Sequence, residues 1–264
     1  MTVRIGTSGW QYRDWSGSFY PARLPQRSWL ESYAARFATV ESNNAFYRLP
    51  ERKIFEAWAE RTPDDFMMAV KVSRYLTHIK RLAEPEEPVA RFIGRVAGLG
   101  TKLGPVLLQL PPQLRCDIGR LERTLDQFPA DMRVAVEFRH PTWFVDGVQR
   151  VLTDRRVALC LADRRRALTP LWRTADWTYL RFHEGRAAPR PCYGRRALET
   201  WATRLAALWS ADEDCWVYFN NDPNACAPWD AARFAGQVRR AGLRPTRVPA
   251  PRSIHVVGRG AASA

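Results

Sequence analysis

The sequence predicts an α/β protein built as a single (β/α)8 barrel of the TIM type. Eight apolar, strand-like segments alternate with about seven helical ones along the chain. Most of these strands end in polar residues, and parallel barrels carry their functional groups at that end. The length of 264 residues is also typical of one barrel. A doubly wound sheet fits less well, because it would concentrate polar strand ends at one switch point.

The predicted elements follow in order, each strand being a short apolar run and each helix a longer segment of helical periodicity. The strands cover residues 5–10, 39–43, 66–72, 106–110, 134–140, 157–162, 177–183 and 215–222. The helices cover residues 28–37, 51–61, 84–98, 118–128, 144–154, 195–209 and 231–241. No clear helix separates the sixth strand from the seventh, so the sequence predicts that this barrel helix is degraded to a loop. The barrel domain is expected to span residues 1–243.

Residues 244–264 have a different composition, with Pro, Arg and small residues but no acidic residue. They show no helical or strand periodicity. The sequence therefore predicts a basic, flexible tail after the barrel.

The composition limits the class of protein. A hydrophobic fraction of 46% argues against disorder, and no apolar run approaches the ~18 residues of a membrane span. The first residues enter a strand at once and leave no room for a signal peptide. We therefore expect a cytoplasmic protein that has no membrane partner.

The cysteines are five in number and scattered, without a C-x-x-C pair. This pattern predicts reduced thiols that serve as packing residues, and neither a disulfide framework nor a zinc site.

The net charge of +14 is open to two interpretations. Basic faces bind polyanions, so nucleic acid is one candidate partner. However, 37 of the 41 basic residues are arginines, which is also consistent with coding bias and with charges spread over solvated helix faces.

The segment 134–144 is the most informative. Glu137 and Arg139 share a parity in the strand, so both side chains leave it on one face, above the small Ala135. The larger apolar residues of the strand have the other parity and suit packing against helices. Pro141 then ends the strand, which places ionisable groups at its carboxyl end.

The other predicted strands supply similar groups. If they form one barrel, a complete set of acid, base and hydrogen-bonding groups gathers at one end. As catalytic residues we predict Glu137, His183, His140 and Lys71. As substrate-binding residues we predict Glu41, Asn43, Gln109, Arg139, Asp163, Arg181, Asn220 and Asn221.

These residues also have structural interpretations. Glu137 can form an ion pair with Arg139 or Arg181 that serves only the scaffold. Lys71 can pair with Glu41, or act as a Schiff-base nucleophile if it is desolvated. A divalent metal could be bound by Glu41, Glu137, Asp163 and His183, but no spacing typical of a metal site supports it. We therefore predict no metal and no organic cofactor. No G-x-G-x-x-G or P-loop motif follows a strand, which indicates no dinucleotide or P-loop nucleotide site.

A set of motifs spread over residues 3 to about 241 is specific when taken together. They are Ile5-Gly6-Thr7-Ser8-Gly9-Trp10 with Phe19-Tyr20-Pro21, Val40-Glu41-Ser42-Asn43 with Phe46-Tyr47-Arg48-Leu49-Pro50, Lys71-Val72-Ser73 with Thr77-His78, Gln109-Leu110-Pro111-Pro112, Glu137-Phe138-Arg139-His140, Arg181-Phe182-His183 and Phe219-Asn220-Asn221-Asp222. In these motifs the chain resembles the YecE-like family, the domain of unknown function 72. The resemblance implies a TIM-type barrel with a rim pocket, and it implies no reaction. The sequence departs from the expected family pattern in three places, which are Glu184-Gly185-Arg186, Pro228-Trp229-Asp230 and the segment from Arg244 onward.

Three functions remain open at this stage. The first is an enzyme that hydrolyses or isomerises an anionic, phosphorylated or carboxylated substrate. In it Arg139 and Arg181 clamp the anion, Glu137 is the base, His183 or His140 the acid, and Lys71 steadies developing negative charge. The second is a nucleic-acid-binding or processing protein that uses the +14 charge, the run Arg164 to Arg166 and the basic tail. The third is a ligand sensor without catalysis.

Overall fold

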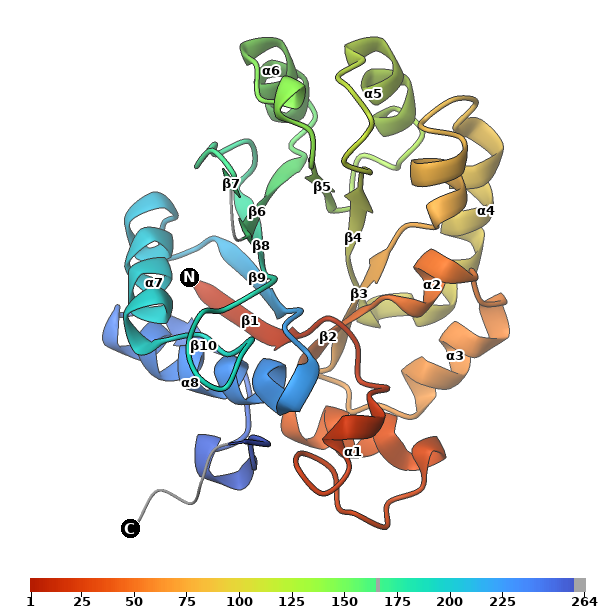
Figure 1. Cartoon of the computed structure of the whole chain (residues 1–264). Coiled ribbons are helices and arrows are strands. Elements are labelled where there is room, and N and C mark those ends of the chain that lie inside the picture. Colours follow the sequence, from red (N-terminus) through yellow and green to blue (C-terminus); the bar gives the residue numbers. More distant parts are fainter. Residues whose placement is uncertain (165–166, 259–264) are drawn as a thin grey trace. The chain divides into compact units, whose positions relative to one another are not determined.

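The computed structural model describes residues 1–164 and 167–258, in which parallel strands alternate with helices (Figure 1). The strands are β1 (Thr2–Thr7), β2 (Thr39–Ser42), β3 (Met67–Lys71), β4 (Leu103–Gln109), β5 (Val134–Glu137), β6 (Ala158–Arg164), β7 (Ala167–Leu168), β8 (Trp177–Phe182), β9 (Asp214–Phe219) and β10 (Arg244–Pro245). The α-helices are α1 (Trp29–Arg36), α2 (Asn44–Tyr47), α3 (Arg52–Glu60), α4 (Glu86–Val96), α5 (Ile118–Leu125), α6 (Asp146–Asp154), α7 (Arg195–Leu208) and α8 (Cys226–Arg240).

The strand order is β10-β1-β9-β8-β6-β5-β4-β3-β2. This α/β architecture is the predicted TIM-type fold, and the predicted helices and strands are present with shifted ends. The largest shift is in α8, which begins at Cys226 and not at residue 231. The predicted loss of one helix is also confirmed, because the short β7 follows β6 and pairs with it antiparallel.

The chain forms two compact units. Unit 1 consists of Met1–Val40, Ala162–Leu168 and Leu180–Ala264. Unit 2 consists of Glu41–Leu161 and Thr169–Tyr179. Each unit is described by itself.

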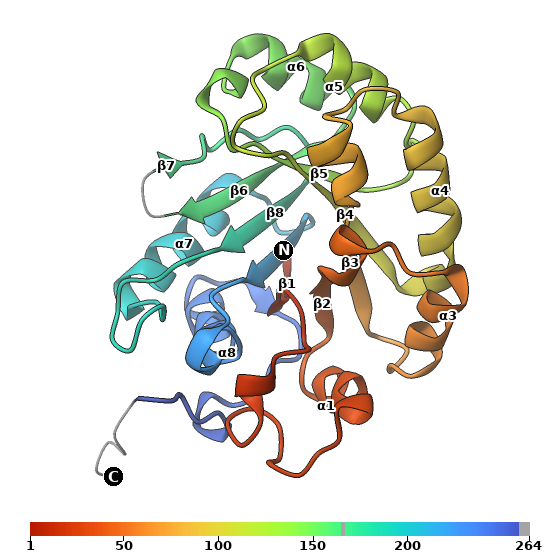
Figure 2. The same ribbon diagram turned by 45° about the vertical axis from the view of Figure 1, so that its right-hand side comes forward.

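In unit 2 the strands β3, β4 and β5 pair in parallel, and the helices α3 to α6 pack along one side of them (Figure 2). The β4 run from Val106 to Leu110 is buried, as expected for a parallel strand covered on both faces. Phe138, which follows β5, stacks on Trp143 with ring centroids 4.8 Å apart. This contact agrees with the prediction that the large apolar side chains of this segment leave it on the face opposite Glu137 and Arg139.

In unit 1 the strand β1 lies between β9 and β10 and pairs with both in parallel. Gly6 of β1 comes very close to Thr39 of β2, since a Cβ on Gly6 would lie 2.3 Å from the Thr39 carbonyl oxygen. Only glycine allows this approach. The Tyr33 hydroxyl donates to the same carbonyl oxygen at 3.1 Å, which fixes α1 against the two strands.

The prediction of a flexible tail from Arg244 is wrong for the described residues. β10 pairs with β1, the amide of Ala38 donates to the carbonyl of Arg247, and the amide of His255 donates to that of Ser18. The segment lacks periodicity because it pairs through its backbone at only a few points. A sequence pattern does not report such pairing. Residues 259–264 lie outside the described part of the chain.

Candidate functional site

In unit 2 the carboxyl ends of β4 and β5 bring three predicted site residues together. Gln109 and Glu137 are register partners, and each is the last residue of its strand. Arg139 donates from Nε to Glu137 Oε1 at 2.9 Å and from Nη2 to Gln109 Oε1 at 3.0 Å. The Glu137 side chain is buried, whereas 26% of the Arg139 side chain is exposed. Arg139 therefore connects two buried acceptors to solvent.

Lys71 ends β3 and lies beside an aromatic ring in the same unit. Its Nζ is 3.8 Å from the centroid of Phe46 in α2, a cation–π contact. The His78 imidazole meets the same ring edge to face, at a centroid distance of 5.0 Å. His78 lies in a turn of π-helix, Tyr75–Ile79, and its Nδ1 is 2.8 Å from the Thr77 hydroxyl. The Phe46 ring thus joins α2, β3 and this turn.

Three cations lie in the surroundings of the partly buried His78. Burial, and to a smaller extent the charges of Lys71, Arg139 and Arg74, together lower the pKa of His78 to about 4. The imidazole is therefore neutral at pH 7. Because both Lys71 and Arg139 act on one imidazole, they create a shared positive potential near these strand ends.

Two further residues that were predicted to bind substrate belong to unit 2. Glu41 lies in β2, and Asn43 directly follows it. Glu41 is buried, and its Oε2 accepts a hydrogen bond from the Tyr179 hydroxyl at 2.7 Å. Asn43 follows the strand and precedes α2, with its side chain half-buried.

His140 has a local structural role. Its Nδ1 lies 2.9 Å from the Thr142 hydroxyl and accepts from the Thr142 amide at 3.3 Å. These contacts cap the short 3-10 helix Pro141–Trp143. One ring nitrogen is thus engaged in the turn, which limits the proton chemistry of His140 to Nε2.

Unit 1 holds the remaining predicted residues. At the ends of β8 and β9, Asn220 Nδ2 lies 3.2 Å from His183 Nδ1. Arg181 is buried, and its Nη2 lies 3.5 Å from Ser8 Oγ. Trp201 donates from Nε1 to Asp163 Oδ2 at 2.7 Å. Burial raises the pKa of Asp163, against the lowering effect of this hydrogen bond and of nearby arginines.

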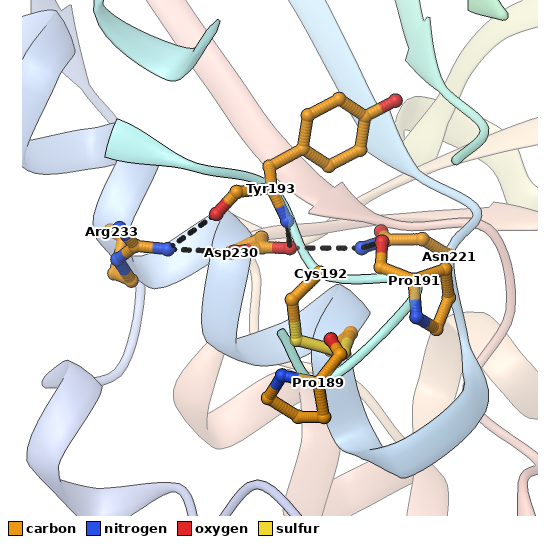
Figure 3. Close-up of polar contacts among 8 residues, drawn as sticks. Pro189, Pro191, Cys192, Tyr193, Asn221, Asp230 and Arg233 are labelled. Carbon is orange, nitrogen blue, oxygen red and sulfur yellow. Dashed lines mark hydrogen bonds and ion pairs between the residues drawn. A yellow bond between two sulfur atoms is a disulfide. The ribbon is translucent and has the colours of Figure 1, made fainter. Parts of the chain in front are cut away.

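Asn221 was predicted to contact a substrate, but its amide serves a buried network in unit 1 (Figure 3). Asn221 Nδ2 donates to Asp230 Oδ2 at 2.9 Å and to the Pro191 carbonyl at 3.1 Å. The Tyr193 amide donates to the same carboxylate oxygen at 2.7 Å, and Arg233 Nη1 donates to Asp230 Oδ1 at 3.1 Å. The network joins β9, α8 and the loop after β8.

A disulfide between Cys192 and Cys226 closes the same region (Figure 3), so the prediction of five reduced cysteines is wrong. The two residues are 34 positions apart in sequence, and only the packing of the loop on α8 brings them together. Cys116, Cys160 and Cys215 are free thiols. Disulfides persist mainly in oxidising compartments, so this bond does not favour the cytoplasmic location predicted above.

Asp230 is the buried ionisable residue that the sequence-based reasoning missed. It is the only acid in the apolar stretch 225–235, and the departure at Pro228-Trp229-Asp230 was its one signal. The pKa of Asp230 is raised to about 7, because the effect of burial exceeds the lowering effect of the donors Tyr193, Asn221 and Arg233.

This pKa predicts how stability depends on pH. The folded state binds a proton on Asp230 up to about pH 7, whereas the unfolded chain releases it near its usual pKa of 3.8. Stability from this group is therefore present below pH 4 and is lost as the pH rises toward 7. Relative to Asp230→Asn, the free energy of unfolding of the wild type should fall by on the order of 4 kcal/mol over this range. Urea denaturation of both proteins measures it, and parallel pH profiles would show that the three donors keep Asp230 ionised.

A cavity of about 550 Å³ lies in unit 2, at the amino ends of β5 and β6. Val134 and Val157 line it, together with the Arg155–Asp126 ion pair at 2.7 Å. It is therefore at the opposite end of β5 from Glu137. None of the predicted site residues lines it.

Two properties of the described ranges bear on the class of site. Among residues 1–164 and 167–258, no group of three or more His, Cys, Asp and Glu side chains could hold a metal ion. Every helix in these ranges is too short or too polar to span a lipid bilayer.

Comparison with known proteins agrees with the fold. The family model described as protein of unknown function DUF72 matches residues 4–253. The UPF0759 protein YunF of Bacillus subtilis (strain 168) is 30% identical, over 83% of this chain and 89% of YunF. A crystal structure of a DUF72 family protein from Thermotoga maritima MSB8 is 27% identical with a TM-score of 0.78, covering 90% of this chain and 100% of that one.

A crystal structure of a DUF72 family protein from Enterococcus faecalis V583 has a TM-score of 0.74 at 19% identity, covering 90% of this chain and 98% of that one. This second similarity supports the fold alone. The family match extends to residue 253 and so includes residues 244–253 of the segment that was expected to lie outside the family pattern. The chain belongs to the DUF72 family of proteins of unknown function.

Proposed function

We propose that the strand-end cluster of unit 2, defined by Lys71, His78, Gln109, Glu137 and Arg139, binds an anionic small molecule with a phosphate or carboxylate group. The observation that carries the proposal is the placement of two cations at neighbouring strand ends. Arg139 is held by Glu137 and Gln109 and is partly exposed, and Lys71 is the last residue of β3. Cationic side chains that act together where parallel strands end are typical of an anion site.

Arg139 is the principal ligand in this proposal. Its guanidinium is held by Glu137 and Gln109, so its plane is fixed before a ligand arrives. A quarter of the side chain is exposed, which allows it to donate to a ligand as well. Lys71 adds a second positive charge from the neighbouring strand β3.

The proposed chemistry is hydrolysis or isomerisation of the bound anion. The ion pair with Arg139 stabilises the charged form of Glu137, which suits a general base and not a general acid. Lys71 would stabilise negative charge that develops on the substrate. In unit 2 the predicted general acid is His140, which would donate a proton from its Nε2. A sensor would bind the same anion without turnover, so a product assay separates these two alternatives.

The pKa of His78 provides a test that needs no known reaction. An anion bound to Lys71 and Arg139 would cancel part of their positive potential, so inorganic phosphate should raise the pKa of His78 from about 4 toward its usual value of 6.5. Arg139→Met should raise this pKa without phosphate and should weaken the response to phosphate. The measurement is an NMR titration of the imidazole at constant ionic strength.

Arg91→Met is the matched control, because Arg91 is an exposed arginine of α4 that pairs with Glu87. Its titration should follow that of the wild type. A His78 pKa that does not respond to phosphate would contradict the proposed anion site.

Nucleic-acid binding is the second candidate, and the +14 charge favours it. Of the run proposed to carry it, Arg165 and Arg166 lie outside the described residues. Several other arginines pair with acids on their own helices, such as Arg52 with Glu56. This pairing supports the interpretation that the charge is spread over solvated faces. Steeply salt-dependent binding of DNA or RNA would support the second candidate, and no binding at low salt would contradict it.

A further inference from the structure

An exposed tyrosine lies next to the proposed anion site. Tyr47 is the last residue of α2, and 72% of it is exposed. Its ring meets Phe46 edge to face at a centroid distance of 5.1 Å. Phe46 is also the ring that contacts Lys71 and His78. One buried ring therefore connects the exposed Tyr47 to two members of the strand-end cluster.

Other apolar side chains are exposed on the same elements. Large hydrophobic residues that reach solvent in the described part of unit 2 include Tyr75, at 40%, and Ile79, at 60%. Both belong to the π-helical turn that carries His78, which adjoins α2 through the contact between Phe46 and His78. Single exposed hydrophobic residues are common and need no explanation. Here, however, three of them lie on the two elements that flank the cationic groups.

We propose that the anionic ligand carries a planar apolar ring, and that Tyr47 stacks on this ring while Lys71 and Arg139 hold the anionic group. The proposal rests on the proposed function and specifies its substrate class as an aromatic phosphate or carboxylate. Tyrosine suits this role because it offers a large flat face with few rotatable bonds. The phosphate or carboxylate of such a ligand would be recognised by charge, and its ring by Tyr47.

Three phosphates of increasing size test this division of roles. Inorganic phosphate probes the cationic groups alone, glycerol phosphate adds polar bulk, and phenyl phosphate adds a planar ring. Phenyl phosphate should bind about tenfold more tightly than glycerol phosphate, because a ring-to-ring contact adds to the shared charge interaction. The readout is the shift of the His78 imidazole signals on titration of each compound.

The variants assign the preference to Tyr47. Tyr47→Ala should remove the difference between phenyl phosphate and glycerol phosphate and leave the affinity for inorganic phosphate unchanged. Tyr47→Phe should keep the difference, since it keeps the ring. Ile54→Ala, which truncates an exposed apolar residue of α3, is the control and should behave as the wild type.

The outcomes separate the two proposals. If phosphate binds but the three compounds bind equally, or if the preference survives Tyr47→Ala, the inference on the ring is overturned and the anion site stands. If no phosphate shifts His78 at all, the proposed anion site fails, and the inference that rests on it fails as well.

Discussion

Arg139→Met is expected to destabilise the protein by on the order of 3 kcal/mol, which is more than Glu137→Gln should cost. The two partners differ in burial, because the Glu137 side chain is 1% exposed and that of Arg139 is 26% exposed. Loss of Arg139 removes a cation whose Nε lies 2.9 Å from the buried carboxylate of Glu137. Loss of the Glu137 charge leaves an arginine that still reaches water and Gln109, so about 2 kcal/mol is expected.

Urea denaturation of the two single variants and the double variant measures both costs and their coupling. If Glu137→Gln costs as much as Arg139→Met, the pair is a scaffold element, and the assignment of Glu137 as a base loses its support. If Glu137→Gln costs clearly less than Arg139→Met and abolishes turnover of a substrate, the carboxylate serves chemistry.

Reduction of the Cys192–Cys226 disulfide is expected to have the other large effect. The bond closes a loop of 34 residues, for which chain-entropy arguments give about 4 kcal/mol of stabilisation. For a chain of this size, the thermal midpoint should fall by roughly 10 °C in the presence of a strong reductant. Mass spectrometry without reductant should detect three free thiols, those of Cys116, Cys160 and Cys215.

The double variant Cys192→Ala and Cys226→Ala provides the control. Its midpoint should be low from the start and should not change when reductant is added. Five free thiols in the wild type, or a thermal midpoint that does not change when reductant is added, would contradict the disulfide.

The fold was predictable because its signals are local. Runs such as residues 106–110 show burial directly, and the polar residue at the end of each run marks the carboxyl end of a strand. The parity argument that placed Glu137 and Arg139 on one face of the strand also needs only adjacent residues. Their hydrogen bond at 2.9 Å agrees with that placement.

The remaining features depend on residues that are far apart in the chain. Asn221 and Asn220 are adjacent and chemically identical, yet one donates to the buried Asp230 and the other lies against His183. Nothing in the sequence distinguishes them, because the packing of α8 decides which amide is turned inward. The pairing of Cys192 with Cys226 and that of Arg244 with Thr2 depend on tertiary structure in the same way.

Unit 1 is assembled from distant segments of the chain, which affects how it folds during synthesis. Its first strand, β1, pairs with β9 and β10, which are synthesised more than two hundred residues later. Most of unit 2, in contrast, comes from the continuous stretch Glu41–Leu161. Pairing between distant segments forms slowly, and the ribosome delays it further. The strand β1 is therefore synthesised well before β9 and β10, and its backbone hydrogen bonds with them must wait until both of those strands have left the ribosome.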